Sequence, residues 1–351
     1  MKKRFITSIV LVLAMSIVLF NHDQSSANDK VMPAEGVSPK YSLVIHGGAG
    51  TITRDRLTAD TEASIRAKLT EALEAGQTIL ADGGTSLDAI QASIMVMENS
   101  AHFNAGYGAV FTAEGRNELD AAIMDGSDLN AGAITGVTRV KNPITLARAV
   151  MDKSRHVMFS GSGAEEFAED VGVEMVDPSY FYTERRWKSL QNFLERQKEK
   201  DTATVYEEKP AFKFGTVGAV AIDQHGNIAA GTSSGGMTGK MFGRVGDVPI
   251  IGAGTYANNK SCGVSATGHG EYFIRATVAH SICALMEYAG MSLEDAAQKI
   301  VMEQLVEMKG SGGIIAVDKD GNTALVFNSR GMYRGSVTNI KPLTTGIFDD
   351  E

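Results

Sequence analysis

Short apolar runs and longer helical spacings follow one another along the first half of the chain. The apolar residues 42–45 are followed at once by His46-Gly47-Gly48, which is typical of a buried strand that ends in a loop. Apolar residues then recur at helical spacing over residues 65–80, and Thr85 with Asp88 indicates the start of a second helix. We expect strands within residues 119–140 and helices at residues 143–153 and 163–171.

A charged segment separates the two halves. Residues 184–213 are dense in charge and poor in core residues, so we expect an exposed linker there. Apolar strands return after Gly215, and the similar segments 219–227 and 314–322 predict two similar hairpins. Residues 271–289 and 292–307 have helical spacing. Because sheets and helices alternate, the predicted class is α/β or α+β, with helical layers covering sheet.

Composition excludes several classes of protein. The 351 residues are 43% apolar and 21% charged, which is typical of a globular chain of one large domain or two modest ones. The formal charge is −9, and no basic run interleaves with aromatic residues, so nucleic acid is not an expected partner. The seven histidines form no H-x-x-x-H pair and join no cysteine cluster, so we expect no transition-metal site.

The two cysteines, Cys262 and Cys283, are too few for a disulfide framework. One bridge between them is possible, but we do not expect it.

The first residues indicate export. Lys2-Lys3-Arg4 precede an uncharged stretch over residues 5–20, and the small residues Ser25 and Ala27 follow. This pattern predicts a signal peptide of residues 1–27, cleaved near Ala27, and a periplasmic or extracellular destination. The apolar stretch is short for a bilayer-spanning helix, which needs about 20 residues. An uncleaved membrane anchor is the alternative.

Two formal motifs lead to other functions and are rejected on context. Residues 252–257 fit the loose dinucleotide pattern G-x-G-x-x-A, but asparagines and a glycine follow where a helix is required. Residues 231–235 fit G-x-S-x-G, and His46-Gly47-Gly48 resembles an oxyanion loop, which together suggest a serine esterase of the α/β-hydrolase type. A nucleophile elbow needs a helix directly after the serine, whereas residues 235–239 are poor helix formers.

Thr216 stands directly after the predicted linker and directly before a predicted strand. Gly-Thr pairs occur five times in the chain, so the pair alone indicates no more than a strand or cap threonine. A cut before Thr216, however, would remove no core element and would leave threonine as the first residue of a strand. A free α-amino group has a pKa of about 7.7–8.0. Near neutral pH it can therefore accept the proton of the threonine's own hydroxyl.

The chain resembles the plant-type asparaginase and isoaspartyl peptidase family of N-terminal-nucleophile hydrolases. The resemblance extends over nearly the whole sequence and rests on seven short motifs. These are residues 46–50 (HGGAG), 103–106 (FNAG), 119–121 (LDA), 215–220 (GTVGAV), 243–247 (GRVGD), 267–271 (TGHGE) and 310–313 (GSGG).

The resemblance implies a four-layer αββα sandwich and a precursor that cuts itself between Gly215 and Thr216. The products would be an α chain of residues 28–215 and a β chain of residues 216–351, which together form one catalytic domain and associate as a dimer of αβ pairs. It implies hydrolysis of the side-chain amide of L-asparagine and of β-aspartyl dipeptides through a threonine acyl-enzyme, without a catalytic cofactor. Neither nucleic acid nor a stable membrane anchor is implied.

The resemblance also assigns roles to single residues. Thr216 would be the nucleophile, the Thr267 hydroxyl and the Gly268 N–H would stabilise the oxyanion, and Asn104 belongs to the catalytic set. Arg244 would bind the substrate α-carboxylate and Asp247 its α-ammonium, with Gly268 and Gly270 beside them; a solvated ion pair is the alternative for the two charged residues. The family's second threonine is replaced by Ser234, which keeps the hydroxyl that would orient the Thr216 amine. A structural sodium ion would be held by backbone carbonyls of Met97, Glu98, Ser100, Phe103, Ala105 and Tyr107.

Three functions stay open at this point: a self-cleaving amidohydrolase, a serine esterase, and an exported amino-acid-binding protein without catalysis. The motifs do not rank L-asparagine against β-aspartyl dipeptides, because they do not describe the leaving-group side of the pocket.

Overall fold

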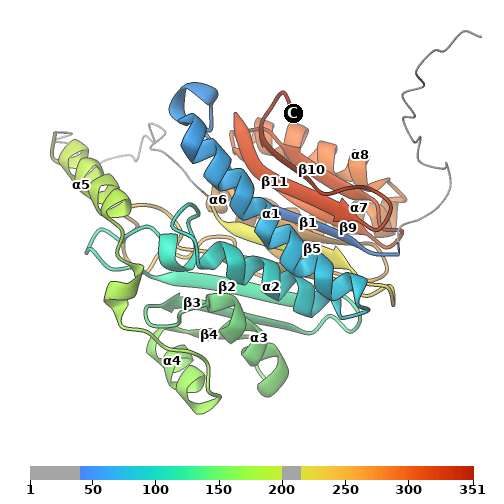
Figure 1. Ribbon diagram of the computed structural model, residues 1–351, viewed down its shortest axis with the longest axis horizontal. Helices are drawn as coiled ribbons and strands as arrows, with labels where there is room; N and C mark the ends of the chain where they lie inside the picture. The colour runs from blue at the N-terminus through green and yellow to red at the C-terminus, as the bar shows by residue number, and fades with distance from the viewer. Residues whose placement is uncertain (1–39, 200–214) are drawn as a thin grey trace, which may run out of the picture. The chain divides into compact units, whose positions relative to one another are not determined.

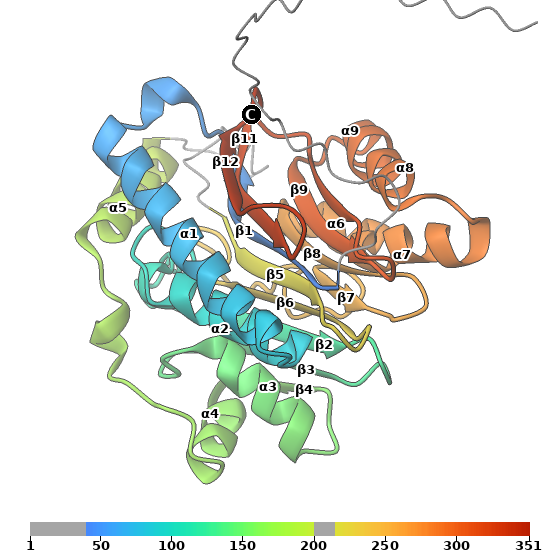
Figure 2. The ribbon, with the colours of Figure 1, turned by 45° about the vertical axis from the view of Figure 1, so that its right-hand side comes forward.

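Two β-sheets lie face to face between two layers of helices in the computed structural model, which describes residues 40–199 and 215–351 (Figure 2). The predicted four-layer αββα sandwich is thereby confirmed. The signal peptide predicted at residues 1–27 and residues 200–213 of the predicted linker lie outside the described residues.

The larger sheet has eight strands in the order β12-β11-β1-β5-β6-β2-β3-β4, and all eight are labelled in Figure 2. Its strands are antiparallel except for the parallel pair of β3 and β4. Their bounds are β1 Ser42–Gly50, β2 Leu119–Asp125, β3 Ala131–Val137, β4 Met158–Ser160, β5 Val217–Ile222, β6 Ile228–Ser234, β11 Gly331–Thr338 and β12 Thr344–Phe348. The segments before and after the Gly215–Thr216 bond therefore build one continuous sheet.

The smaller sheet has four antiparallel strands in the order β10-β9-β8-β7. Their bounds are β7 Thr255–Ala257, β8 Cys262–Gly268, β9 Gly312–Asp318 and β10 Thr323–Phe327. An apolar layer joins the two sheets, with Val44, Val220 and Ala230 from the larger sheet against Ile315 and Val317 from the smaller one.

Amphipathic helices cover the outer face of each sheet (Figure 1). On the larger sheet, α1 begins after the N-cap Thr58 and buries Ile65, Leu69, Leu73 and Leu80 at helical spacing. The helices on this side are α1 Ala59–Ala81, α2 Ser86–Glu98, α3 Pro143–Lys153 and α4 Gly161–Asp170. The smaller sheet is covered by α6 Gly270–Ala276, α7 Val278–Ala289, α8 Leu293–Gln298, the π-helical turn η4 Lys299–Gln304, and α9 Leu305–Glu307.

Short 3₁₀ turns are η1 Arg54–Arg56, η2 Gly106–Gly108 and η3 Pro178–Phe181. Within residues 40–199 and 215–351, no helix is long and apolar enough to cross a bilayer.

The two predicted hairpins are present as β5–β6 and β9–β10, and they use the same turn chemistry. The carboxylate of Asp223 accepts backbone N–H bonds from His225 and Asn227 at 2.9 and 3.0 Å. Asp318 accepts the equivalent pair from Asp320 and Asn322. Such local bonds are the reason aspartate favours turns. They explain why the similarity of residues 219–227 and 314–322 predicted both hairpins correctly.

The prediction of an exposed linker over residues 184–213 is wrong for its first half. Residues Glu184–Glu199 form the helix α5, in which Arg186 and Leu190 are buried. Trp187 packs edge-on against Phe111 with ring centroids 5.2 Å apart. The segment is charged because most of the helix surface faces solvent, while a narrow stripe of side chains is enough to attach it to the body.

A disulfide joins Cys262 on β8 to Cys283 on α7, with Cα atoms 5.3 Å apart, so the expectation of two unbridged cysteines is wrong. The sequence gives only their separation of 21 residues, whereas the bridge depends on α7 folding back over β8. It fastens α7 to the outer face of the smaller sheet.

Candidate active site

Thr216 lies immediately before β5, which runs between β1 and β6 in the larger sheet. It is 8% exposed, and its Oγ1 donates a hydrogen bond to Ser234 Oγ at 3.0 Å. Ser234 ends β6, and its Oγ also accepts from the Gly236 N–H at 3.0 Å. In the uncut chain Ser234 thus contacts the Thr216 hydroxyl, while the predicted contact with a free amine requires cleavage first.

The Gly215–Thr216 bond is enclosed by three parts of the chain. The backbone N–H of Asn104 donates to the Gly215 carbonyl at 3.4 Å. Gly48 has a φ of +114°, and a Cβ built on it would lie 2.4 Å from the nitrogen of Gly215, so only glycine fits at this point of β1. A Cβ on Gly215 would lie 2.6 Å from Thr267 Oγ1. The bond therefore sits between β1, the loop that carries Asn104, and the end of β8.

Asn104 ties this loop to the segment after β6. Its Nδ2 donates to the Gly236 carbonyl at 2.7 Å, and its Oδ1 accepts from the Val110 N–H at 3.0 Å. Its backbone carbonyl accepts from the Gly235 N–H at 3.0 Å. The Asn104 side chain, predicted to belong to the catalytic set, thus holds two loops together, and the group that contacts the Gly215 carbonyl is the backbone N–H.

Thr267 is fully buried at the end of β8, next to Gly268. Its Oγ1 accepts a hydrogen bond from the Ala49 N–H at 3.2 Å. A hydroxyl has one hydrogen to donate as well as two acceptor lone pairs. Accepting from Ala49 therefore leaves the Thr267 hydroxyl able to donate to an oxygen beside Thr216, which is the action predicted for it.

The predicted substrate-binding residues converge at the start of α6. A Cβ on Gly270 would lie 2.8 Å from Arg244 Nη2 and 2.9 Å from Asp247 Oδ1. Asp247 is 4% exposed, and its Oδ2 has no hydrogen-bond partner among the residues that the structure describes. Burial raises the pKa of Asp247 to about 7, and the nearby Arg244 only partly opposes this. A buried carboxylate oxygen without a partner is costly unless a ligand cation satisfies it.

Arg244 forms an ion pair, but its partner is Glu271 rather than Asp247. Glu271 Oε1 lies 2.9 Å from both Nε and Nη2 of Arg244, and the Glu271 side chain is 53% exposed. A guanidinium presents two edges to carboxylates, one through Nε and one through its two terminal nitrogens. Glu271 takes the first edge and orients the guanidinium, and the terminal edge adjoins Gly246 and Gly270.

The loop predicted to hold sodium gathers carbonyl oxygens, which are the ligands that hard cations prefer. A Cβ on Gly108 would lie 2.0 Å from the Phe103 carbonyl oxygen and 2.8 Å from that of Ser100. A Cβ on Gly106 would lie 2.4 Å from the Glu98 carbonyl oxygen. Each of these three carbonyls thus lies close to a glycine of this loop, and the sodium ion stays a prediction.

The other three residues predicted as sodium ligands make contacts of their own. The carbonyls of Met97 and Ala105 accept N–H bonds from Ser100 and Gly108 at 3.1 and 3.2 Å. Tyr107 lies in η2, where its ring packs on Tyr180 with centroids 5.4 Å apart. In the described ranges no group of three or more His, Cys, Asp or Glu side chains gathers as a metal site.

The two rejected motifs have structural roles. Ser233, the serine of the G-x-S-x-G pattern, lies inside β6 and donates to the buried carboxylate of Glu98 at 2.6 Å. No helix follows it before Thr255, so it is not at a nucleophile elbow. Residues 252–257 lead into the short strand β7 rather than into a helix.

Sequence reasoning missed a set of buried polar groups beneath Thr216. His46 on β1 is fully buried, with its Nδ1 3.0 Å from the Thr216 carbonyl oxygen and its Nε2 2.9 Å from Ser265 Oγ. Ser265 Oγ is in turn hydrogen-bonded to Thr232 Oγ1 on β6. A usable signal was present, because Thr232 and Ser234 follow Ile228 and Ala230 at every second position and so share the face that meets the smaller sheet.

Known proteins are similar to the chain over most of its length. The family model described as Asparaginase matches residues 39–347. An isoaspartyl peptidase of Escherichia coli K12 is 47% identical over 315 residues, covering 89% of this chain and 97% of that protein. An isoaspartyl peptidase of Salmonella typhimurium is 48% identical over 312 residues (88% and 99%), and an isoaspartyl peptidase/L-asparaginase of Mus musculus is 41% identical over 323 residues (92% and 95%).

Proposed function

This chain belongs to the asparaginase family and is a hydrolase, and from that premise we propose that it cuts itself between Gly215 and Thr216 and then uses Thr216 as its nucleophile. The substrates we propose are the side-chain amide of L-asparagine and the isopeptide bond of β-aspartyl dipeptides. The observation that carries the proposal is the environment of the Gly215–Thr216 bond. The buried Thr216 hydroxyl is hydrogen-bonded to Ser234, and the adjacent Gly215 carbonyl accepts a hydrogen bond from the Asn104 N–H.

These contacts support a self-cleavage step of the following kind. The Thr216 hydroxyl attacks the Gly215 carbonyl carbon, and the oxyanion that develops accepts from the Asn104 N–H. The carbon–nitrogen bond then breaks as the hydroxyl proton passes to the leaving nitrogen, so that Gly215 becomes an ester on Thr216 Oγ1 and the α-amine of Thr216 is released. Water hydrolyses the ester, which gives Gly215 a carboxylate and returns the hydroxyl to Thr216.

Substrate hydrolysis reuses the same hydroxyl with a different base. The free α-amine of Thr216 takes the hydroxyl proton, because its pKa of about 7.7–8.0 suits neutral pH. Thr216 Oγ1 attacks the side-chain carbonyl of the substrate, and the oxyanion accepts from the Thr267 hydroxyl and the Gly268 N–H. The amine leaves with the proton as ammonia or an amino acid. Water then hydrolyses the acyl-enzyme and releases aspartate.

The ends of the substrate meet complementary charges. Asp247, whose Oδ2 lacks a partner within the described residues, would bind the α-ammonium. The terminal edge of Arg244 would bind the α-carboxylate in bidentate fashion, with Glu271 holding the guanidinium in place. Gly270 keeps the space between them open.

Three further features belong to the proposal. We propose that the carbonyls of Glu98, Ser100 and Phe103 help to hold a structural sodium ion, which would stiffen the loop that carries Asn104. We propose that the α and β chains pair and then dimerise. We also propose export after cleavage near Ala27, which the Cys262–Cys283 bridge supports because disulfides persist in oxidising compartments.

The test is a denaturing gel and a mass measurement on the purified protein, together with rates on L-asparagine and a panel of β-aspartyl dipeptides. We expect a β chain of 136 residues beginning at Thr216 and hydrolysis of at least one substrate class. A single uncut chain without hydrolysis of either class would contradict the proposal.

A further inference from the structure

A line of uncharged polar side chains crosses the layer between the two sheets and ends at Thr216. The line consists of His46, Ser265, Thr232 and Thr255, all four fully buried. Each comes from a different strand: β1, β8, β6 and β7. An apolar cluster fills much of this layer, so a polar line here is costly unless its members satisfy one another.

The contacts give the line a direction. Thr255 Oγ1 donates to Thr232 Oγ1 at 2.7 Å, and Thr232 Oγ1 lies 2.7 Å from Ser265 Oγ. Ser265 Oγ lies 2.9 Å from His46 Nε2, and His46 Nδ1 lies 3.0 Å from the Thr216 carbonyl oxygen. A carbonyl can only accept, so Nδ1 carries the hydrogen, and a neutral imidazole then accepts at Nε2 from Ser265. Burial keeps the imidazole neutral by lowering the pKa of His46 to about 3.

We propose that His46 is a positioning residue for the nucleophile, held as the Nδ1–H tautomer by Ser265 so that it fixes the carbonyl of Thr216. This inference rests on the proposed function, because it concerns the Thr216 that cleavage produces.

The physical need arises when the bond to Gly215 is cut. Thr216 then loses its tether on one side, and its amine can swing about the Cα–C bond. Orienting the Thr216 carbonyl fixes that torsion, and so fixes where the amine and the side chain together lie relative to Ser234 and to the proposed oxyanion donors. The hydroxyl can attack a substrate carbonyl efficiently only from the correct position beside those groups.

The strand between His46 and Ser265 leaves room for this contact. A Cβ on Gly218 of β5 would lie 2.0 Å from Ser265 Oγ and 2.4 Å from His46 Nε2. Gly218 pairs with His46 in the β1–β5 ladder, so a side chain there would occupy the point at which the two groups meet. The close approach therefore depends on glycine at position 218.

The test compares two replacements of His46 in the processed enzyme. In His46→Asn the amide nitrogen occupies the place of Nδ1 and can still donate to Thr216, whereas in His46→Gln it occupies the place of Nε2. We expect kcat on a β-aspartyl dipeptide to fall about tenfold or more in His46→Gln and by roughly threefold or less in His46→Asn, with KM nearly unchanged in both, on the scale of one lost buried hydrogen bond. Equal loss in the two variants, or a loss confined to KM, would overturn the proposal.

A serine pair supplies the matched control. Ser265→Ala removes the donor to His46, while Ser42→Ala removes an equally buried hydroxyl of β1 that donates to the Gly321 carbonyl at 2.7 Å. We expect Ser265→Ala to lower kcat several-fold and Ser42→Ala to leave it unchanged, although both lose a buried hydrogen bond. Equal kcat in the two variants would reduce the line to a purely structural one.

A measurement on unmodified protein covers the case in which the His46 variants do not fold. Nitrogen-15 spectra of the histidine rings should show His46 as the neutral Nδ1–H tautomer, without titration between pH 5 and 8. An Nε2–H tautomer or a titration near pH 6.5 would overturn the proposal. Mass analysis of the β chain is done first, because an uncut and inactive wild-type protein would refute the proposed function rather than the role of His46.

Discussion

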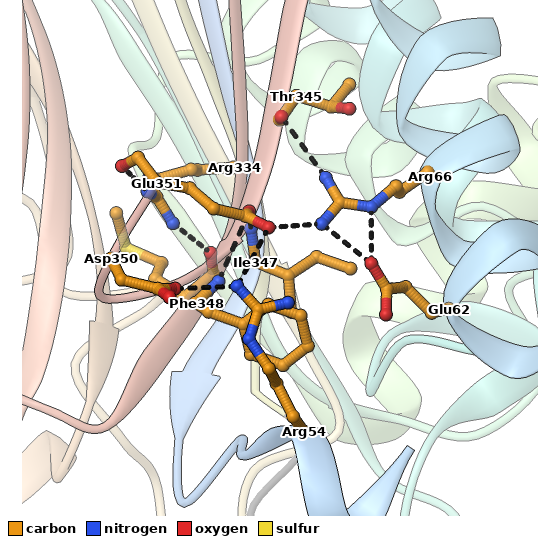
Figure 3. A network of polar contacts seen from close by, with 10 residues as sticks. Arg54, Glu62, Arg66, Arg334, Thr345, Ile347, Phe348, Asp350 and Glu351 are labelled. Atoms are coloured by element: carbon orange, nitrogen blue, oxygen red, sulfur yellow. Dashed lines mark hydrogen bonds and ion pairs between the residues drawn. The ribbon is translucent and has the colours of Figure 1, made fainter. Parts of the chain in front are cut away.

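Two arginine–carboxylate regions of this protein are built in opposite ways. At the candidate active site, Asp247 is buried near Arg244, yet Oδ2 of Asp247 has no partner within the described residues. Where β12 meets α1, Glu351 accepts from Arg66 at 2.6 Å and from the Ile347 N–H at 2.7 Å (Figure 3). The first carboxylate has a buried oxygen without a partner among the described residues, whereas the second already has its partners.

The region around Glu351 joins segments from both sides of the proposed cleavage site. Arg66 on α1 also pairs with Glu62 at 2.8 Å, Arg54 pairs with Asp350 at 2.8 Å, and Arg334 on β11 donates to the Glu351 backbone carbonyl at 2.5 Å (Figure 3). These contacts would tie the α chain to the β chain after cleavage.

The pKa values of the two carboxyl groups move in opposite directions, because only one of the groups has hydrogen-bond donors that outweigh the effect of burial. Burial without a partner raises the pKa of Asp247 to about 7. Burial acts in the same sense on Glu351, but bonds from the Ile347 N–H and from Arg66 outweigh it and lower the pKa of that carboxyl below its ordinary value. A carboxyl whose pKa is raised by burial without a partner is a candidate for binding a ligand, whereas the lowered pKa of Glu351 reflects contacts already made within the fold.

The largest effect is expected from Asp247→Asn. The neutral amide keeps the shape of the side chain but loses the charge that would hold the substrate α-ammonium. A hydrogen bond between charged groups contributes about 1.5–3 kcal/mol, so kcat/KM should fall roughly ten- to 150-fold. Steady-state kinetics on a β-aspartyl dipeptide measure this, with Glu351→Gln as the control that should leave kcat/KM unchanged. Equal losses in the two variants would erase the distinction between the regions.

Arg244→Lys should lower kcat/KM by about ten- to a hundredfold, because an ammonium cannot form the two parallel bonds of a guanidinium to a carboxylate. Arg66→Lys is the matched control, since it makes the same replacement in the region around Glu351 and should not change kcat/KM. Self-cleavage should be intact in both variants by mass analysis. Normal kcat/KM with lysine at position 244 would leave Arg244 with no role beyond its ion pair with Glu271.

The raised pKa of Asp247 also predicts how stability depends on pH. Between the ordinary pKa near 3.9 and the folded value of about 7, the folded state holds a proton that the unfolded state has released. The free energy of unfolding that Asp247 contributes therefore falls as pH rises through this range. Asp247→Asn lacks this dependence, so its stability relative to the wild type should grow from pH 4 to pH 7. Urea unfolding, with both compared in an uncut Thr216→Ala background, measures the difference, and a constant difference would contradict the raised pKa.

The smallest effect is expected from Glu351→Gln. Ion pairs with this degree of exposure contribute about 1 kcal/mol or less, so unfolding should become easier by that amount at low salt. The difference between variant and wild type should shrink as salt is added, because screening weakens the pair in the wild type alone. A loss of several kcal/mol would place Glu351 among the buried contacts of the core.

Local sequence patterns were enough to predict most of the fold. The N-cap at Thr85 accepts from the Asp88 N–H at 3.1 Å as predicted, and the apolar spacing of residues 65–80 lies within α1. Both features depend on neighbours within a few residues. The helix α5 and the Cys262–Cys283 bridge were missed because each depends on packing against a distant element, which neither charge density nor cysteine spacing records.

For the candidate site too, the sequence predicted the residues in its motifs but not the contacts between distant elements. Thr216, Ser234 and Thr267 were singled out from motifs, and the structure brings Thr216 together with both hydroxyl-bearing residues around one bond, although their chemical roles stay predictions. The sequence could not show that Glu271, rather than Asp247, pairs with Arg244. Nor could it show that His46 meets Ser265, because strand alternation gives the face of each residue but not which strands of the two sheets lie opposite each other.

The most direct test of the account is the mass of the chains in purified wild-type protein and in Thr216→Ala, combined with a hydrolysis assay on both. The account predicts a β chain that begins at Thr216 in an active wild-type enzyme, and one uncut, inactive chain in the variant, because a single hydroxyl performs both reactions. A variant that is cut at the same bond, or that hydrolyses β-aspartyl dipeptides at the wild-type rate, would contradict it.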